Sequence, residues 1–174
     1  MGTIRHIRGR RSRLRWRTIG KWLWYRELDP VSPGECLLRA IPNTADYFKS
    51  SMGRWSVDPY AFTPSKKRDP DGLSFYREDF ASPKTVAREC QHPASARVAR
   101  IKVAELRALG LTVTPSLDRL AGHVIVQEMN YGASKDPATK QKVKSLTIAL
   151  SQLASKNIAF APPEMEWPER QKKT

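Results

Sequence analysis

The stretch "ECLLRAI" at residues 35–41 gives the first indication of the fold. It follows the turn signals Asp29-Pro30 and Ser32-Pro33-Gly34, and Pro42 comes directly after it. A short apolar run between such signals predicts a buried β-strand. Arg39 stands inside this run, where an unpaired charge would be costly. We therefore expect its guanidinium group to meet an anion or a carboxylate.

Further extended segments follow this strand, each bounded by turn residues. Apolar and basic side chains alternate in "RVARIKV" at residues 97–103, which is typical of a strand with two different faces. The segment "GHVIVQEMNY" at residues 122–131 is the most apolar, so we expect it to be central. The other expected extended segments are residues 54–64 (with Val57, Tyr60 and Phe62 as core candidates), 73–77 and 111–114.

Helices are expected between these strands. Asn43 is a plausible N-cap for a short helix, and Ser82-Pro83 opens another that runs towards Cys90. A brief helix within residues 104–110 would stop at Gly110. The clearest helix begins at Asp136-Pro137, because its apolar residues recur every three or four positions; these residues are Val143, Leu146, Leu150 and Leu153.

The order of these elements is mixed and shows no regular strand–helix alternation. It predicts an α+β domain with a compact mixed or antiparallel sheet and a few packed helices, in preference to a doubly wound parallel sheet. A chain of 174 residues suits one domain with tails. We place the domain at residues 27–158, after a flexible basic arm at 1–26 and before an irregular, charged, proline-containing tail at 159–174.

The charge of the chain points to an anionic partner. Lys and Arg number 31 and Asp and Glu number 17, which gives a net charge of +14. Such an excess favours nucleic acid, an acidic membrane face or an acidic protein. The apolar residues of the arm fit helical spacing only in part, which makes a membrane surface the weakest of these choices.

The basic arm fits phosphate binding, since guanidinium groups pair bidentately with phosphate oxygens and Trp16 can stack on a base. The preferred interpretation is therefore a protein that binds RNA or DNA, alone or as a subunit of a nucleoprotein assembly. The expected contacts are the arm residues Arg5, Arg8, Arg10, Arg11, Arg13, Arg15, Trp16, Arg17 and Lys21, and a basic face of Arg97, Arg100, Lys102, Lys140, Lys142 and Lys144. An interaction module for an acidic protein partner is a further possibility.

An enzyme acting on a nucleotide or RNA is the alternative. Its pocket would lie near Arg39, Ser74, His123 and Glu128, because Glu128 ends an apolar strand and His123 begins it. A histidine near cationic groups can serve acid–base cleavage of RNA. Ser74 follows the turn Asp69-Pro70-Asp71-Gly72, which we interpret first as a hairpin connection and second as a ligand loop.

In chain order, Arg39, Ser74 and Glu128 resemble the arginine, strand serine and glutamate of the ADP-ribosyltransferases. The serine here lies in "LSF" where that family has a Ser-Thr-Ser triplet, and Val126 stands two places before the glutamate. The resemblance implies that Arg39 binds the dinucleotide phosphates, Ser74 holds the nicotinamide ribose and Glu128 orients the ribose for transfer. NAD is a cofactor only under this alternative; otherwise no cofactor is predicted.

Several motifs of known enzyme classes are absent, which narrows the possible functions. The chain has no Gly-rich phosphate loop with lysine, no G-x-S-x-G elbow and no H-E-x-x-H motif. Cys36, Cys90, His92 and His123 lack paired zinc-ligand spacing, so no metal site is predicted. Two cysteines and the lack of a long apolar run favour a cytoplasmic protein with reduced thiols and no transmembrane segment.

Overall fold

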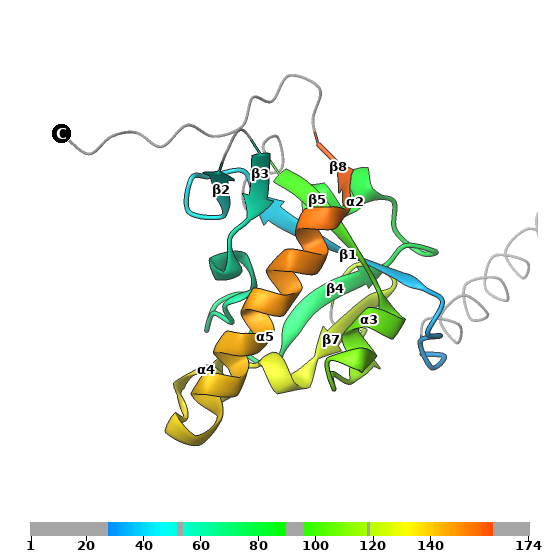
Figure 1. Cartoon of the computed structure of the whole chain (residues 1–174). Helices are drawn as coiled ribbons and strands as arrows, with labels where there is room; N and C mark the ends of the chain where they lie inside the picture. The colour runs from blue at the N-terminus through cyan, green and yellow to red at the C-terminus, as the bar shows by residue number, and fades with distance from the viewer. Residues whose placement is uncertain (1–27, 52–53, 90–95, 118, 162–174) are drawn as a thin grey trace, which may run out of the picture.

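The computed structural model describes residues 28–51, 54–89, 96–117 and 119–161. Its main feature is a six-stranded sheet in the order β6-β7-β4-β1-β5-β8, in which every neighbouring pair is antiparallel (Figure 1). The strands are β1 (Cys36–Pro42), β4 (Leu73–Arg77), β5 (Ala96–Lys102), β6 (Val113–Pro115), β7 (His123–Val126) and β8 (Ile158–Phe160). Helices pack on this sheet, so the predicted α+β class is confirmed.

The first predicted strand, β1, lies near the middle of the sheet. It pairs with β5 along its whole length, from Cys36 opposite Lys102 to Pro42 opposite Ala96. With β4 on its other side it pairs over a shorter stretch, which ends at Leu38 opposite Tyr76. β1 therefore stays paired with β5 throughout, whereas β1 and β4 separate after Leu38.

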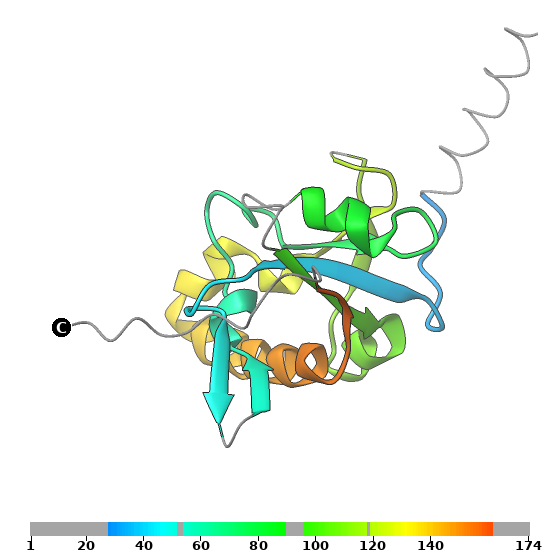
Figure 2. The same ribbon diagram turned by 90° about the horizontal axis from the view of Figure 1, so that it is seen from above.

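Helices cover both faces of the sheet, as the view from above shows (Figure 2). The long helix α5 (Pro137–Lys156) and the short helix α3 (Val103–Ala108) lie on one face, and α2 (Pro83–Arg88) lies on the other. Alternate residues of β1 enter the two cores: Leu37 and Ile41 join the larger cluster on the α5 side, and Leu38 joins the smaller cluster on the α2 side.

Helix α5 forms where its sequence predicts it. Asp136 caps the N-terminus by accepting hydrogen bonds from the backbone N–H groups of Ala138 and Thr139, and Pro137 occupies the first turn. Val143, Leu146 and Leu150 are buried against the sheet. Each such side chain contributes about 1.5–3 kcal/mol through removal from water.

The region after β1 differs from the expected helix at Asn43. The chain forms a hairpin of β2 (Phe48–Ser51) and β3 (Arg54–Val57), followed by the 3-10 helix η1 (Pro59–Phe62). Phe48 is buried and pairs with Val57 across the hairpin, so pairing with a later strand outweighs the local capping signal. The sequence predicts Tyr60 as a core residue, but its side chain is 56% exposed, so this prediction is wrong.

Two strands occupy unexpected places. β7 lies one strand from the sheet edge and is not central, because β6 pairs along its outer side. β8 pairs with β5 at Val98 and Ala99, so the sheet extends to Phe160, into the segment 159–174 that the sequence assigns to the tail. The remaining short elements are η3 (Gln127–Met129) and α4 (Tyr131–Lys135), which lead from β7 into α5.

Candidate functional site

Arg39 lies in β1 on the α5 side of the sheet. Its guanidinium carbon is 5.7 Å and 5.6 Å from the ring centroids of Phe62 and Phe75. The side chain is buried, and it donates two hydrogen bonds to Asp69: Nη1 to Oδ1 at 3.2 Å and Nη2 to Oδ2 at 3.4 Å. The expectation that Arg39 meets a carboxylate is confirmed.

The Arg39–Asp69 pair stands where strand pairing stops. Continuing the β1–β4 register beyond Leu38 would bring Ala40 opposite Ser74. Arg39 Nη1 instead donates to the Ser74 carbonyl oxygen at 2.8 Å, and the Ser74 N–H donates to Asp69 Oδ1 at 3.3 Å. Since a buried peptide group without a partner costs about 1–3 kcal/mol, these bonds allow the two strands to separate.

The pKa of the Asp69 carboxyl reflects this environment. Burial acts to raise the pKa, but the charge and hydrogen bonds of Arg39, the charge of Arg68 and the Ser74 N–H outweigh it and lower the pKa below its ordinary value. Asp69 is therefore ionised at neutral pH, with its side chain only 1% exposed.

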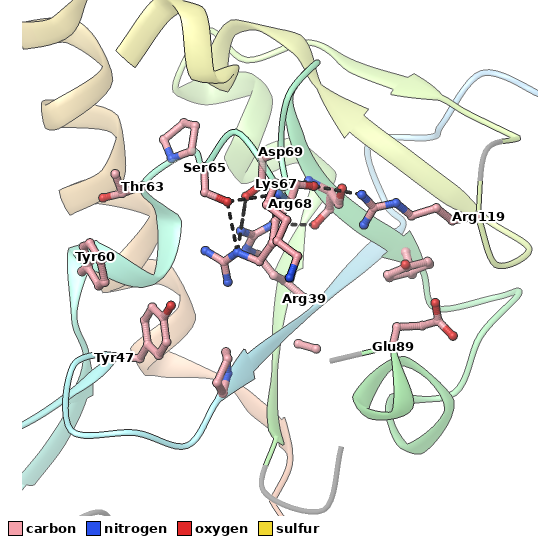
Figure 3. A pocket seen from close by; sticks show the side chains of 15 residues that line it. Arg39, Tyr47, Tyr60, Thr63, Ser65, Lys67, Arg68, Asp69, Glu89 and Arg119 are labelled. Carbon is pink, nitrogen blue, oxygen red and sulfur yellow. Dashed lines mark hydrogen bonds and ion pairs between the residues drawn. The ribbon is translucent and has the colours of Figure 1, made fainter. Parts of the chain in front are cut away.

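A cavity of about 580 Å³ lies beside this ion pair. Its walls come from β1 and the loop after it, η1 and the loop after it, β4, the end of α2 and the loop before β7 (Figure 3). We call it the tyrosine cavity. It is lined by Arg39, Ala40, Pro42, Tyr47, Tyr60, Thr63, Pro64, Ser65, Lys67, Arg68, Asp69, Ser74, Tyr76, Glu89 and Arg119.

Two stacked tyrosines form one wall. The rings of Tyr47 and Tyr60 are 5.5 Å apart between centroids and are inclined by 15°. The Arg68 guanidinium carbon lies 5.8 Å from the Tyr47 centroid, within cation–π range. Tyr60 is the exposed member of the stack, so an aromatic ligand can reach its ring.

The other walls are mainly cationic. Lys67 and Arg68 come from the loop after η1, and Arg119 comes from the loop before β7. Arg119 Nη2 donates to the Arg68 carbonyl oxygen at 2.9 Å, which ties the two loops together. Asp69 pairs with Arg39, and Arg68 Nε also lies 3.9 Å from Asp69 Oδ2. The second carboxylate that lines the cavity is that of Glu89.

Tyr76 lies deeper in the cavity and is 4% exposed. Burial raises the pKa of its phenol, and the negative charge of Glu89 adds to the rise, while Arg119 acts in the opposite direction. Tyr76 is therefore a neutral phenol at neutral pH, able to donate or accept a hydrogen bond. Its ring is 5.3 Å from that of His123 on the neighbouring strand.

The four residues of the predicted catalytic pocket do not gather around one cavity. Arg39 and half-buried Ser74 line the tyrosine cavity, whereas buried His123 lies outside the lining and contacts Tyr76. Both carboxylate oxygens of Glu128 accept the N–H of Thr112 at 3.2 Å. The chain turns into η3 after β7, and this turn carries Glu128 away from the cavity.

The predicted basic face is also divided. Arg97 is buried, donates to Asn43 Oδ1 at 3.0 Å and lies 5.7 Å from the Phe48 ring. Its burial lowers the pKa of the guanidinium group. Arg100 is three positions further along β5, hence on the opposite face, and it pairs with Glu78. Arg97 and Arg100 therefore do not share one face of the sheet.

The remaining basic candidates are exposed or lie outside the described residues. Lys102 is exposed at the N-cap of α3, and Lys140, Lys142 and Lys144 are exposed on α5. The arm residues lie outside the described part of the chain; they are Arg5, Arg8, Arg10, Arg11, Arg13, Arg15, Trp16, Arg17 and Lys21. Cys90 and His92 lie outside it as well.

Within residues 28–51, 54–89, 96–117 and 119–161, no three His, Cys, Asp or Glu side chains come together as a metal-binding group. No helix in the same ranges is both long enough and apolar enough to cross a lipid bilayer.

Sequence reasoning did not identify the principal lining residues of the cavity, which are Tyr47, Tyr60, Lys67, Arg68 and Arg119. A signal for two of them was present, since the cationic run 66–68 directly precedes a tight turn. Arg119 had no such signal, because it meets Arg68 only after β4 and β7 have paired.

Comparisons with protein-family models, curated proteins and solved structures gave no match to this chain.

Proposed function

We propose that the protein binds single-stranded nucleic acid, with one base held in the tyrosine cavity. The observation that carries this proposal is the exposed ring of Tyr60, stacked on Tyr47 beside the cations Lys67, Arg68 and Arg119. Proteins that bind single strands combine an aromatic platform for bases with a positively charged groove for the backbone.

The energetics favour an unpaired base. Stacking a base on an aromatic side chain contributes about 1–3 kcal/mol, and the stacked partner ring already holds Tyr60 in place. In a duplex the base faces are covered by their neighbours, so a concave site of this kind suits single-stranded segments. The net charge of +14 adds affinity for the phosphate backbone without sequence preference.

The cavity fits binding better than the alternatives drawn from the sequence. Arg39 already bonds Asp69 and Ser74, and Glu128 lies elsewhere, so the geometry does not favour the ADP-ribosyltransferase arrangement. The acidity of a protein partner would match the cations but would not account for the exposed, stacked Tyr60 ring. A nucleotide matches both features.

Lys67 and Lys66 provide a matched pair for the test. Both are exposed, and they are neighbours in the chain, but only Lys67 lines the cavity. We expect Lys67→Ala to weaken binding of a labelled single strand of about ten nucleotides by about fivefold, or about 1 kcal/mol. Lys66→Ala removes the same charge and should have a smaller effect. Fluorescence anisotropy at fixed salt measures both variants.

Two results would contradict binding in the tyrosine cavity. Equal losses for Lys66→Ala and Lys67→Ala would mean that the charge acts without regard to position. Tighter binding of a duplex than of a single strand would contradict the role given to Tyr60. Either result would remove the support for binding in the cavity.

A further inference from the structure

A second cavity, of about 400 Å³, lies between α5 and the loop after η1. We call it the lysine cavity. Lys140 and Lys144 line it one helical turn apart on α5, about 6 Å along the helix axis. The other lining residues are Thr63, Ser134, Pro137, Gln141, Val143 and Thr147.

The chemistry of the lysine cavity suits an anion. No carboxylate is among the described residues that line it. The hydroxyls of Ser134 and Thr147 donate to the carbonyl oxygens of Tyr131 and Lys144, at 2.7 and 2.8 Å. The exposed ammonium groups of Lys140 and Lys144 therefore supply the principal donors, and their spacing lets them reach one phosphate or two successive phosphates.

The two cavities adjoin each other at Thr63, which lines both. Helix α5 packs against η1, so the loop that follows η1 lies directly beside the helix. Figure 3 shows Thr63 at the edge of the tyrosine cavity, on the same side as Tyr60. A chain that leaves Tyr60 along this edge would meet the lysine cavity next.

We propose that the lysine cavity is a phosphate subsite of the same single strand, which crosses Thr63 from the tyrosine cavity to Lys140 and Lys144. This inference rests on the proposed function and deepens it, because it gives the strand a path. The base stacks at Tyr60, and phosphates further along the strand meet α5. Lys142 points elsewhere, since it is two residues from each of these lysines and does not line the cavity.

The test compares Lys144→Ala with Lys142→Ala, which remove the same charge from exposed positions of one helix. Binding is measured for a trinucleotide and for a strand of about twelve nucleotides, within the usual range of site sizes. We expect Lys144→Ala to weaken the long strand about threefold to fivefold and to reduce its salt slope by about 0.7. Trinucleotide binding should not change, and Lys142→Ala should have little effect on either ligand.

Equal effects of the two variants on the long strand would overturn the subsite. So would a loss of trinucleotide affinity in Lys144→Ala as large as the loss for the long strand. These results leave the proposed function intact if Lys67→Ala still weakens the trinucleotide. Failure of the parent protein to bind either strand would overturn the proposed function, and the subsite with it.

Discussion

Arg39 and Asp69 perform a structural task that neither residue could perform alone. The strands β1 and β4 separate after Leu38, and the pair supplies the hydrogen bonds that Ser74 would otherwise lack. A buried ion pair adds little net stability, because the cost of desolvation offsets most of the Coulomb attraction. Its value here is that the sheet can open beside the tyrosine cavity without leaving backbone groups unsatisfied.

Removing one partner should be costly. Asp69→Asn leaves the buried Arg39 guanidinium without its counter-charge, and we expect a loss of about 3–5 kcal/mol in the free energy of unfolding at pH 7. Asp71→Asn, at an exposed position two residues away, serves as the control and should change little. Urea unfolding of the two variants measures the difference.

The same pair predicts a pH dependence. The pKa of Asp69 is lower in the folded protein than its ordinary value. Its stabilising contribution is therefore fully present above the unfolded-state pKa of about 4, and it is lost as the pH falls through the folded-state pKa. The gap in unfolding free energy between the parent and Asp69→Asn should narrow as the pH falls below about 4. A gap of constant size down to pH 2 would contradict this assignment.

Gly72 is a second residue on which the loop depends. Its φ is 154°, and a Cβ atom added there would lie 2.5 Å from the carbonyl oxygen of Val126. We expect Gly72→Ala to lower the free energy of unfolding by about 2–3 kcal/mol or more, through the clash and the backbone strain. Gly34→Ala is the control, because its nearest contact would be 4.0 Å away. Similar melting temperatures for the two variants would refute the close approach.

At the scale of elements, local sequence signals predicted the strands and helices whose ends are marked by turn or capping residues. The strands at β1 and β4 and the helix α5 were predictable, because turn residues, alternation and a capping aspartate define them. β3 lies within the extended segment predicted at residues 54–64, but β2 and β8 were not predicted, since each is a short segment whose strand depends on its pairing with β3 or β5. The prediction that β7 is central failed for a similar reason, because strand order depends on pairing between segments. Only β6, which is three residues long, lies outside β7 in the sheet.

Helix α5 offers a test at this scale, because it covers one face of the sheet and carries the lysine cavity. Asp136 accepts the N–H groups of Ala138 and Thr139 at its N-terminus, at 3.3 and 3.2 Å. Asp136→Ala should lower the free energy of unfolding by about 0.5–2 kcal/mol. Asp46→Ala removes an exposed carboxylate from a loop and serves as the control. Equal stabilities would show that the cap contributes nothing.

For the whole molecule, the charge and the cavity act at different ranges. Under the proposed function, the excess of cations would attract any polyanion, while stacking at Tyr60 would require an unpaired base. The composition alone leads to the first expectation. The cavity was not predictable, because Tyr47, Lys67 and Arg119 come together only when β4, β7 and the loop after η1 are in place.

The two effects can be separated by deleting residues 1–21, which carry many arginines and no acidic residue. The truncated protein should bind single strands more weakly, with a shallower salt dependence, because fewer counterions are released. Lys67→Ala and Lys66→Ala should still differ within the truncated protein, because the cavity is unchanged. An unaltered salt slope would show that the arm does not contact nucleic acid.

The central claim is that a base stacks on Tyr60, and photochemical cross-linking tests it most directly. A single strand carrying a photoreactive base would be irradiated with the full-length protein, and tryptic peptides would be analysed by mass spectrometry. Tyr60 lies in the tryptic peptide of residues 55–66, between the cleavage sites at Arg54 and Lys66. We predict the principal nucleotide adduct on Tyr60 in this peptide, and its loss in Tyr60→Leu. Adducts confined to residues 1–26 would contradict the claim and assign binding to the arm alone.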